Sequence, residues 1–126
     1  MRQQYHFRRS QQGQLLIWDV IKLIELAREL EVISVPLESI KELDEAFWYD
    51  LGGAKPTCRN VAEHAKLIQQ TDLSYPILLC SEGRVMDGMH RVCKALMNGD
   101  SHIRAVRFPH VIEPNFIDVD PDTLPY

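Results

Sequence analysis

The strongest constraint on the fold is a stretch in the second half of the chain, where two short extended segments lead into a helix. The runs Pro76–Cys80 and Arg84–Met86 predict strands, because they are apolar and are separated by turn-forming residues. From Met89 onward, apolar side chains recur at helical spacing, and Gly99 is a typical helix stop. The sequence therefore predicts a strand–turn–strand–helix unit.

The junction between the second strand and the helix reads Asp87-Gly88-Met89-His90-Arg91. Glycine lets another group approach the backbone closely, and the free N–H groups of a first helical turn attract anions. His90 and Arg91 add two side chains that can carry positive charge. The junction predicts a phosphate or nucleotide site, with Gly88, Met89, His90 and Arg91 in contact with phosphate and Asp87 beside them.

A purely structural interpretation of the same residues is open. Asp87 can cap the helix, Gly88 can relieve a tight turn, and Arg91 can face solvent. This interpretation is weakened by His90 and Arg91, because a structural helix start favours acidic rather than basic residues in its first turn.

The order of these elements resembles the signature region of the ParB/sulfiredoxin superfamily. The opening strand of that family is similar to Ile33–Ile40, its first helix to Asn60–Gln70, and the resemblance spans about residues 32–108. The residues that match the signature are Val85–Arg91, Ala95-Leu96, Gly99 and Ile103–Val106. The resemblance implies a compact ParB/sulfiredoxin-like α/β (α+β) domain with a small mixed sheet.

Members of this superfamily bind nucleotide phosphates at this helix start, and they include sulfinic-acid reductases, CTP-dependent partition proteins, free-serine kinases and proposed nucleases. Sulfiredoxins place their catalytic cysteine where this chain has Met89, so sulfinic-acid reduction is not expected. Partition proteins carry a more arginine-rich box and a downstream DNA-binding region. The Asp-Gly-x-His-Arg form is most similar to the free-serine kinase branch and to small uncharacterised relatives.

The resemblance also implies roles for individual residues. Arg91 would pair with phosphate oxygens of ATP, ADP or CTP, and His90 would donate to a phosphate or stabilise developing charge. Asp87 would hold a nucleotide-bound magnesium ion or orient a small hydroxyl-bearing acceptor. Arg59, which precedes the expected first helix of the core, is expected to face the same cleft.

The segment Asp44–Asp50 combines three aromatic and three acidic side chains ahead of a flexible loop. In kinase-like relatives an acidic residue in this part of the chain acts as general base, which makes Glu45 and Asp50 candidates. The alternative is that Phe47 and Trp48 pack into the core while the carboxylates remain in water.

The two ends of the chain are expected to embellish the core. Residues 14–31 are strongly apolar and predict an N-terminal helix that packs on the sheet or forms a homodimer with a second copy. Trp18 is expected to be a core or interface anchor. Arg2, Arg8 and Arg9 predict a solvated basic arm, and residues 109–126 an extended C-terminal strap.

The expected helix near residues 60–70 carries two further predictions. Asn60-Val61-Ala62-Glu63 resembles a capping box, which would start the helix there. Val61, Ala65 and Ile68 are spaced to lie on a sheet.

Composition agrees with one small domain over residues 1–126, of which 45% are apolar. The net charge of −4 argues against nucleic-acid binding, and therefore against a nuclease. No apolar run is long enough to span a membrane and no secretory signal opens the chain, so the expected location is the cytoplasm. The three cysteines are widely spaced and are expected in the core or on the surface, without a zinc site.

Two functions follow from these observations. The first is binding of nucleotide phosphates, combined with phosphoryl transfer to a small hydroxyl-bearing acceptor. The alternative is a non-enzymatic nucleotide-responsive or protein-interaction module built on the same site.

Overall fold

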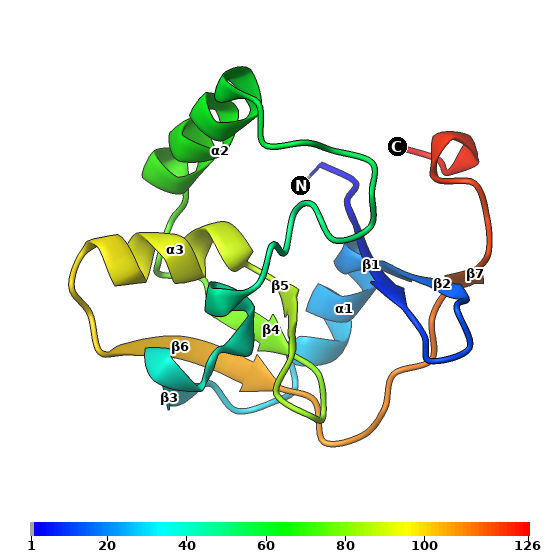
Figure 1. Ribbon diagram of the computed structural model, residues 1–126. Coiled ribbons are helices and arrows are strands. Elements are labelled where there is room, and N and C mark those ends of the chain that lie inside the picture. Colours follow the sequence, from blue (N-terminus) through cyan, green and yellow to red (C-terminus); the bar gives the residue numbers. More distant parts are fainter. Residues whose placement is uncertain (1) are drawn as a thin grey trace.

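Over residues 2–126, two sheets and three α-helices make up an α+β fold (Figure 1). The computed structural model describes residues 2–126. The strands are β1 Tyr5–Arg9, β2 Leu15–Asp19, β3 Ile33–Pro36, β4 Ile77–Leu79, β5 Val85–Asp87, β6 His102–Arg107 and β7 Phe116–Ile117. The α-helices are α1 Val20–Ala27, α2 Cys58–Gln70 and α3 Met89–Met97, and the short 3-10 helices are η1 Leu37–Ser39, η2 Lys41–Asp44 and η3 Pro121–Thr123.

The central sheet has four strands in the order β3-β6-β4-β5. Strands β4 and β6 run parallel, while β3–β6 and β4–β5 are antiparallel pairs. This sheet is mixed, as the sequence predicts. The parallel pair needs a crossover, which β5 and α3 provide by carrying the chain back from β4 to β6.

Strand β4 is buried on both faces of the central sheet, which explains why it is apolar at every position. Ile77 and Leu79 face a cluster beneath α3, whereas Leu78 faces a second cluster beneath α1. Successive strand residues point to opposite faces, so a short strand can supply both cores. The start of α3 is fixed from below because Met89 and Val92 are buried in the first cluster.

The N-terminal region differs from the predicted helix over residues 14–31. Leu15–Asp19 forms β2, and the helix begins only at Val20, where the Asp19 carboxylate accepts hydrogen bonds from the backbone of the first turn. Arg8 and Arg9 of the predicted basic arm lie in β1, which pairs with β2 in an antiparallel hairpin, and Arg2 precedes the strand. The apolar residues of β2 are therefore buried through sheet pairing and not through one long helix. Helix α1 then packs on the central sheet within the same chain.

The C-terminal strap completes the second sheet, whose strand order is β1-β2-β7. The Asp118 carboxylate accepts from the backbone N–H of Leu15 at 2.8 Å, and the Trp18 indole donates to the Ile112 carbonyl at 2.8 Å. Trp18 is thus a buried core anchor, as expected. The C-terminal residues lie against β1, where the Tyr5 hydroxyl donates to the Pro125 carbonyl and the Tyr5 and Tyr126 rings meet edge to face.

Helix α2 departs from the prediction at its start and in its packing. Its N-cap is Thr57, whose hydroxyl accepts from the Asn60 N–H at 3.1 Å, so the expected capping box does not form. No residue of α2 is buried, and the Val61 side chain is 51% exposed. The helix lies over α3 rather than on the sheet (Figure 1), tied to it by the Lys94 ammonium, which donates to the Thr71 carbonyl at 2.7 Å. Within residues 2–126, no helix has the length and apolar character needed to cross a membrane.

Candidate functional site

The start of α3 is an open helix terminus. Its N-cap is Gly88, with φ of 102° and ψ of 24°, and no side chain caps the free N–H groups of the first turn. A Cβ atom on Gly88 would lie 2.7 Å from Nη2 of Arg91 and 2.7 Å from Cγ2 of Ile77. Glycine is therefore needed here twice, for the left-handed backbone and for the space that the Arg91 side chain occupies.

Arg91 folds back over this terminus and pairs with Asp87. Its Nη2 atom lies 2.9 Å from Oδ2 of Asp87, an i,i+4 ion pair in which both side chains are mostly buried. The buried Nε atom of Arg91 has no hydrogen-bond partner. The guanidinium is thus held in place by one carboxylate and keeps unused donor capacity beside the open terminus.

An aromatic stack holds His90, the other candidate side chain of the junction. Nδ1 of His64 on α2 lies 2.8 Å from Nε2 of His90 on α3. The Trp48 ring stacks on both imidazoles, with ring centroids 4.1 Å from His64 and 4.7 Å from His90. Two imidazole nitrogens at this distance share one proton, so at least one of the rings is neutral.

Burial also favours the neutral rings. It is the largest cause that lowers the pKa of His90, to about 4, and the nearby His64 and Arg91 add to the effect. Burial likewise lowers the pKa of His64, against a smaller opposite influence of Glu63. At neutral pH, Arg91 is therefore the permanent cation of the junction, and His90 acts as a neutral hydrogen-bonding group.

The junction opens into a cavity of about 740 Å³ between α1, α2 and the central sheet, called here the α1–α2 cavity. Asp87, Gly88, His90 and Arg91 line one end of it. The rest of the wall is mostly apolar and includes Ile24, Leu67 and Tyr75. Met89 does not line this cavity: its side chain is buried in the core, so only its backbone is placed to meet a ligand.

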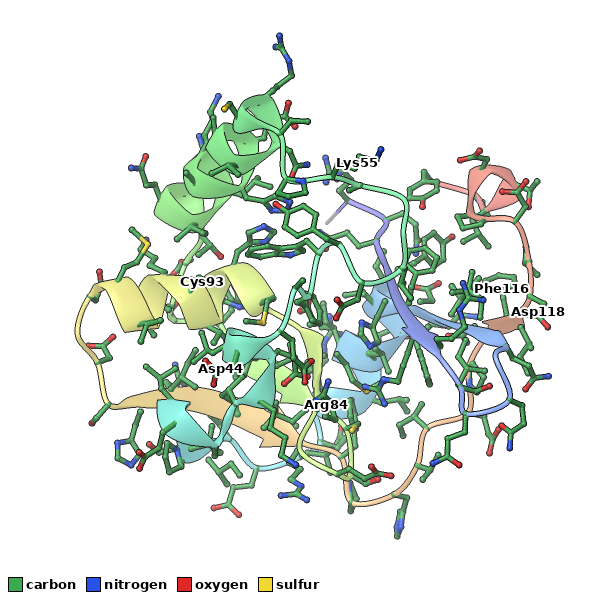
Figure 2. All side chains as sticks on the ribbon, viewed as in Figure 1. Asp44, Lys55, Arg84, Cys93, Phe116 and Asp118 are labelled. Atoms are coloured by element: carbon green, nitrogen blue, oxygen red, sulfur yellow. The ribbon has the colours of Figure 1, made fainter. Side chains whose placement is uncertain are left out.

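The other predicted site residues lie elsewhere. Glu45 binds Arg84 in a two-pronged ion pair, with Nη2–Oε1 at 2.6 Å and Nη1–Oε2 at 2.9 Å. Figure 2 shows Arg84 on the hairpin between β4 and β5, below the start of α3. Asp50 lines a second cavity together with Glu45, and neither residue lines the α1–α2 cavity. Arg59 is exposed on the first turn of α2 and, within residues 2–126, lines neither cavity.

Sequence reasoning missed the partners of His90. Trp48 was a candidate for core packing and His64 was not singled out, yet Trp48 stacks on His90 and on His64, which contacts His90. A sequence signal does exist, because Asn60, His64 and Ile68 recur at i,i+4 spacing and form the less exposed side of α2. Tyr49 confirms this side of the helix by donating to Oδ1 of Asn60 at 2.6 Å.

Comparison of the chain with protein-family models, with curated proteins and with solved structures finds no significant match.

Proposed function

We propose that this protein binds a nucleotide through phosphates placed at the start of α3. The observation that carries the proposal is the uncapped, glycine-initiated first turn of α3 with the Arg91 guanidinium folded over it. The resemblance of the junction to the ParB/sulfiredoxin signature supports the same assignment.

The chemistry of this corner suits a phosphate. Free backbone N–H groups and the helix dipole attract an anion, and a guanidinium binds phosphate oxygens through paired hydrogen bonds. Arg91 contributes Nε and its remaining N–H groups, because Asp87 occupies only part of the guanidinium. His90 adds a neutral ring beside the same cavity.

The remainder of the nucleotide fits the α1–α2 cavity. Its volume of about 740 Å³ is in the range of small-molecule sites, and Ile24, Leu67 and Tyr75 provide an apolar wall for a base. Among residues 2–126, no group of three or more His, Cys, Asp or Glu side chains is arranged to hold a metal ion. A magnesium ion would arrive on the phosphates, and Asp87 is the carboxylate placed to meet it.

Two activities are compatible with such a site. Phosphoryl transfer to a small hydroxyl-bearing acceptor requires a carboxylate within reach of the acceptor. Asp87 is the only acidic residue in the described chain that lines the α1–α2 cavity. The other two candidates lie elsewhere: Glu45 is paired with Arg84, and Asp50 lines the second cavity. This arrangement favours the non-enzymatic nucleotide-responsive module, and it makes phosphoryl transfer depend on Asp87 alone.

Titration calorimetry with ATP, ADP and CTP, each with and without magnesium, tests the binding proposal. We expect saturable binding of at least one nucleotide that Arg91→Ala weakens and Arg59→Ala leaves unchanged. Absence of binding by all three, or equal binding by the Arg91 variant, contradicts the proposal.

The choice between enzyme and module needs a separate assay. Labelled nucleotide is incubated with a pool of hydroxyl-bearing metabolites, using the wild-type protein and Asp87→Asn. Transfer of label that falls by roughly 10²–10⁴-fold in the variant supports a phosphotransferase. Nucleotide binding without any transfer of label supports the module.

A further inference from the structure

A second cavity, of about 410 Å³, lies on the other side of β5 between strand β1 and helix η2. We call it the β1–η2 cavity. It brings together side chains from segments far apart in the sequence, and the residues that matter here are His6, Glu42, Phe47, Trp48, Asp50 and Arg84. It shares none of its lining residues with the α1–α2 cavity.

Glu42 is the most unusual residue of this cavity. Its side chain is 2% exposed, and Oε2 accepts from the Val85 N–H at 2.6 Å and lies 3.4 Å from Nε of Arg84. The other oxygen, Oε1, is buried and has no hydrogen-bond partner. The remaining arms of Arg84 are taken by Glu45, so Arg84 is not free to turn toward Oε1. A buried carboxylate oxygen of this kind requires a donor from elsewhere.

His6 presents a second unpartnered atom in the same cavity. The residue is 7% exposed, and its Nε2 is buried without a hydrogen-bond partner. The ring is fixed between Trp18, at a centroid distance of 5.6 Å, and Phe47, stacked at 6.3 Å. Burial, followed by the charge of Arg8, lowers the pKa of His6 to about 3, so the ring is neutral at pH 7 and one of its nitrogens accepts hydrogen bonds.

The walls of the cavity combine aromatic side chains with charges of both signs. The acidic residues are Glu42, Glu45 and Asp50. The three arginines of the lining are engaged elsewhere: Arg8 lies over the Trp18 ring, Arg9 donates to the Gly13 carbonyl, and Arg84 is paired with Glu45. Phe47 and Trp48 line it together with Tyr5 and Phe7 from β1. Aromatic faces attract cations, as the position of the Arg8 guanidinium 5.5 Å from the Trp18 ring centroid illustrates in the same region.

We propose that the β1–η2 cavity binds a small molecule that carries a primary ammonium group. The ammonium would donate to Oε1 of Glu42 and to the imidazole of His6, and its apolar body would lie against Phe47 and Trp48. This proposal stands independently of nucleotide binding, because the two cavities have no lining residue in common.

The competing explanation is that ordered water alone satisfies Oε1 and Nε2, since water commonly fills such roles in proteins. The two explanations differ in their response to charge. Ammonium binding depends on the carboxylate and discriminates an amine from the alcohol of the same shape, whereas a hydrated cavity does neither.

The experiment follows tryptophan fluorescence at pH 7 while two amines, butylamine and phenethylamine, are titrated against their neutral counterparts, 1-butanol and 2-phenylethanol. Trp48 lines the cavity and Trp18 touches His6, so occupancy should change the signal. We expect saturable binding of at least one amine, with its alcohol weaker by about tenfold or more, as is typical for loss of one charged hydrogen bond.

Glu42→Gln is the central variant, because the amide keeps the shape and can still accept from Val85 but loses the charge. It should weaken amine binding about tenfold, while the exposed Glu38→Gln should leave it unchanged. Asp50→Lys, at an exposed position on the cavity rim, should also weaken binding and covers the case in which the Glu42 variant does not fold.

Three outcomes overturn the proposal. They are absence of saturable binding by both amines, equal binding of amine and alcohol, and unchanged amine affinity in a folded Glu42→Gln or Asp50→Lys protein. Any of these leaves ordered water as the explanation for Oε1 and Nε2.

Discussion

The two cavities of this protein contain similar side chains, but they differ in the kind of atom that is left without a hydrogen-bond partner. Each has an arginine paired with a carboxylate, and each has a histidine whose pKa is lowered mainly by burial. In the α1–α2 cavity the unpartnered atom is Nε of Arg91, a donor. In the β1–η2 cavity the unpartnered atoms are Oε1 of Glu42, an acceptor, and Nε2 of His6.

The two arginine–carboxylate pairs differ because one joins neighbouring residues in the sequence and the other joins distant segments. Asp87 ends β5 and Arg91 lies four residues later in the first turn of α3, and the two form a single hydrogen bond. Arg84 meets Glu42 and Glu45 from a distant segment: Nη1 and Nη2 donate to Glu45, and Nε lies 3.4 Å from Oε2 of Glu42. An arginine–carboxylate pair therefore does not by itself identify a ligand. What indicates whether the site suits an anion or a cation is the atom without a hydrogen-bond partner: a donor suits an anion, and an acceptor suits a cation.

The largest expected effect comes from removing Glu42, the buried carboxylate of the β1–η2 cavity. Glu42→Ala leaves the Val85 N–H and the Nε of Arg84 without their buried acceptor, and we expect a loss of about 3 kcal/mol in the free energy of unfolding. Urea unfolding measures the loss. The exposed Glu38→Ala is the control and should change stability by about 0.5 kcal/mol or less. Similar stability of both variants would mean that Glu42 does not hold the β1–η2 cavity together.

Arg91→Ala tests the Asp87–Arg91 pair, in which the guanidinium keeps donors without a partner. It should weaken nucleotide binding by roughly 1.5–3 kcal/mol, the usual cost of a lost charged hydrogen bond, with little change in folding. Titration calorimetry measures the affinity and circular dichroism the fold, with Arg59→Ala as the matched control on the exposed side of α2. If Arg91→Ala unfolds the chain, the residue is structural and the phosphate assignment is lost.

The contrast between the cavities also explains what the sequence could predict. The strand–turn–strand–helix unit and the neighbouring positions of Asp87, Gly88 and Arg91 follow from local spacing, and the structure contains all of them. The mixed character of the central sheet was predicted as well. The assignment to the ParB/sulfiredoxin fold remains a prediction.

The β1–η2 cavity could not be predicted because its contacts join distant segments. Nothing in the local sequence shows that Glu45 meets Arg84, 39 residues away, or that His6 stacks on Phe47. The helix expected over residues 14–31 was wrong because a continuous apolar run fits a buried strand as well as a helix. Asp19, which caps α1, is the sequence signal that separates the two elements.

Gly88→Ala tests whether the start of α3, at the end of the α1–α2 cavity, requires glycine. The new Cβ would collide with Arg91 and Ile77 at a position with φ of 102°, so we expect a loss of about 1–2 kcal/mol in stability together with weaker nucleotide binding. Gly53→Ala is the control, since a Cβ there meets nothing within 4 Å and its φ is not positive. Equal stability of the two variants would show that the α3 terminus tolerates a side chain.

Acidification should destabilise the aromatic stack. His90 has a pKa of about 4 in the folded protein and an ordinary value of 6.5, so the unfolded chain binds more protons between these values. Stability is therefore fully retained above pH 6.5 and falls as the pH drops toward about 4. Urea unfolding across this window should show a shallower pH dependence for His90→Asn than for wild type. An identical dependence would mean that protonation of His90 is not linked to folding.

The smallest expected effect has the opposite sign and probes the pairing of Arg91 directly. Asp87 competes with an incoming phosphate for Nη2 of Arg91, so Asp87→Asn should release that donor. Without magnesium, nucleotide affinity should rise by about two- to fivefold, in keeping with the modest strength of a single i,i+4 ion pair. With magnesium the gain should shrink or reverse, because the amide is a poorer ligand for the ion. Calorimetry of wild type and variant in both conditions provides the four affinities. A loss of affinity without magnesium would show that Asp87 positions Arg91 for the phosphate and does not compete with it.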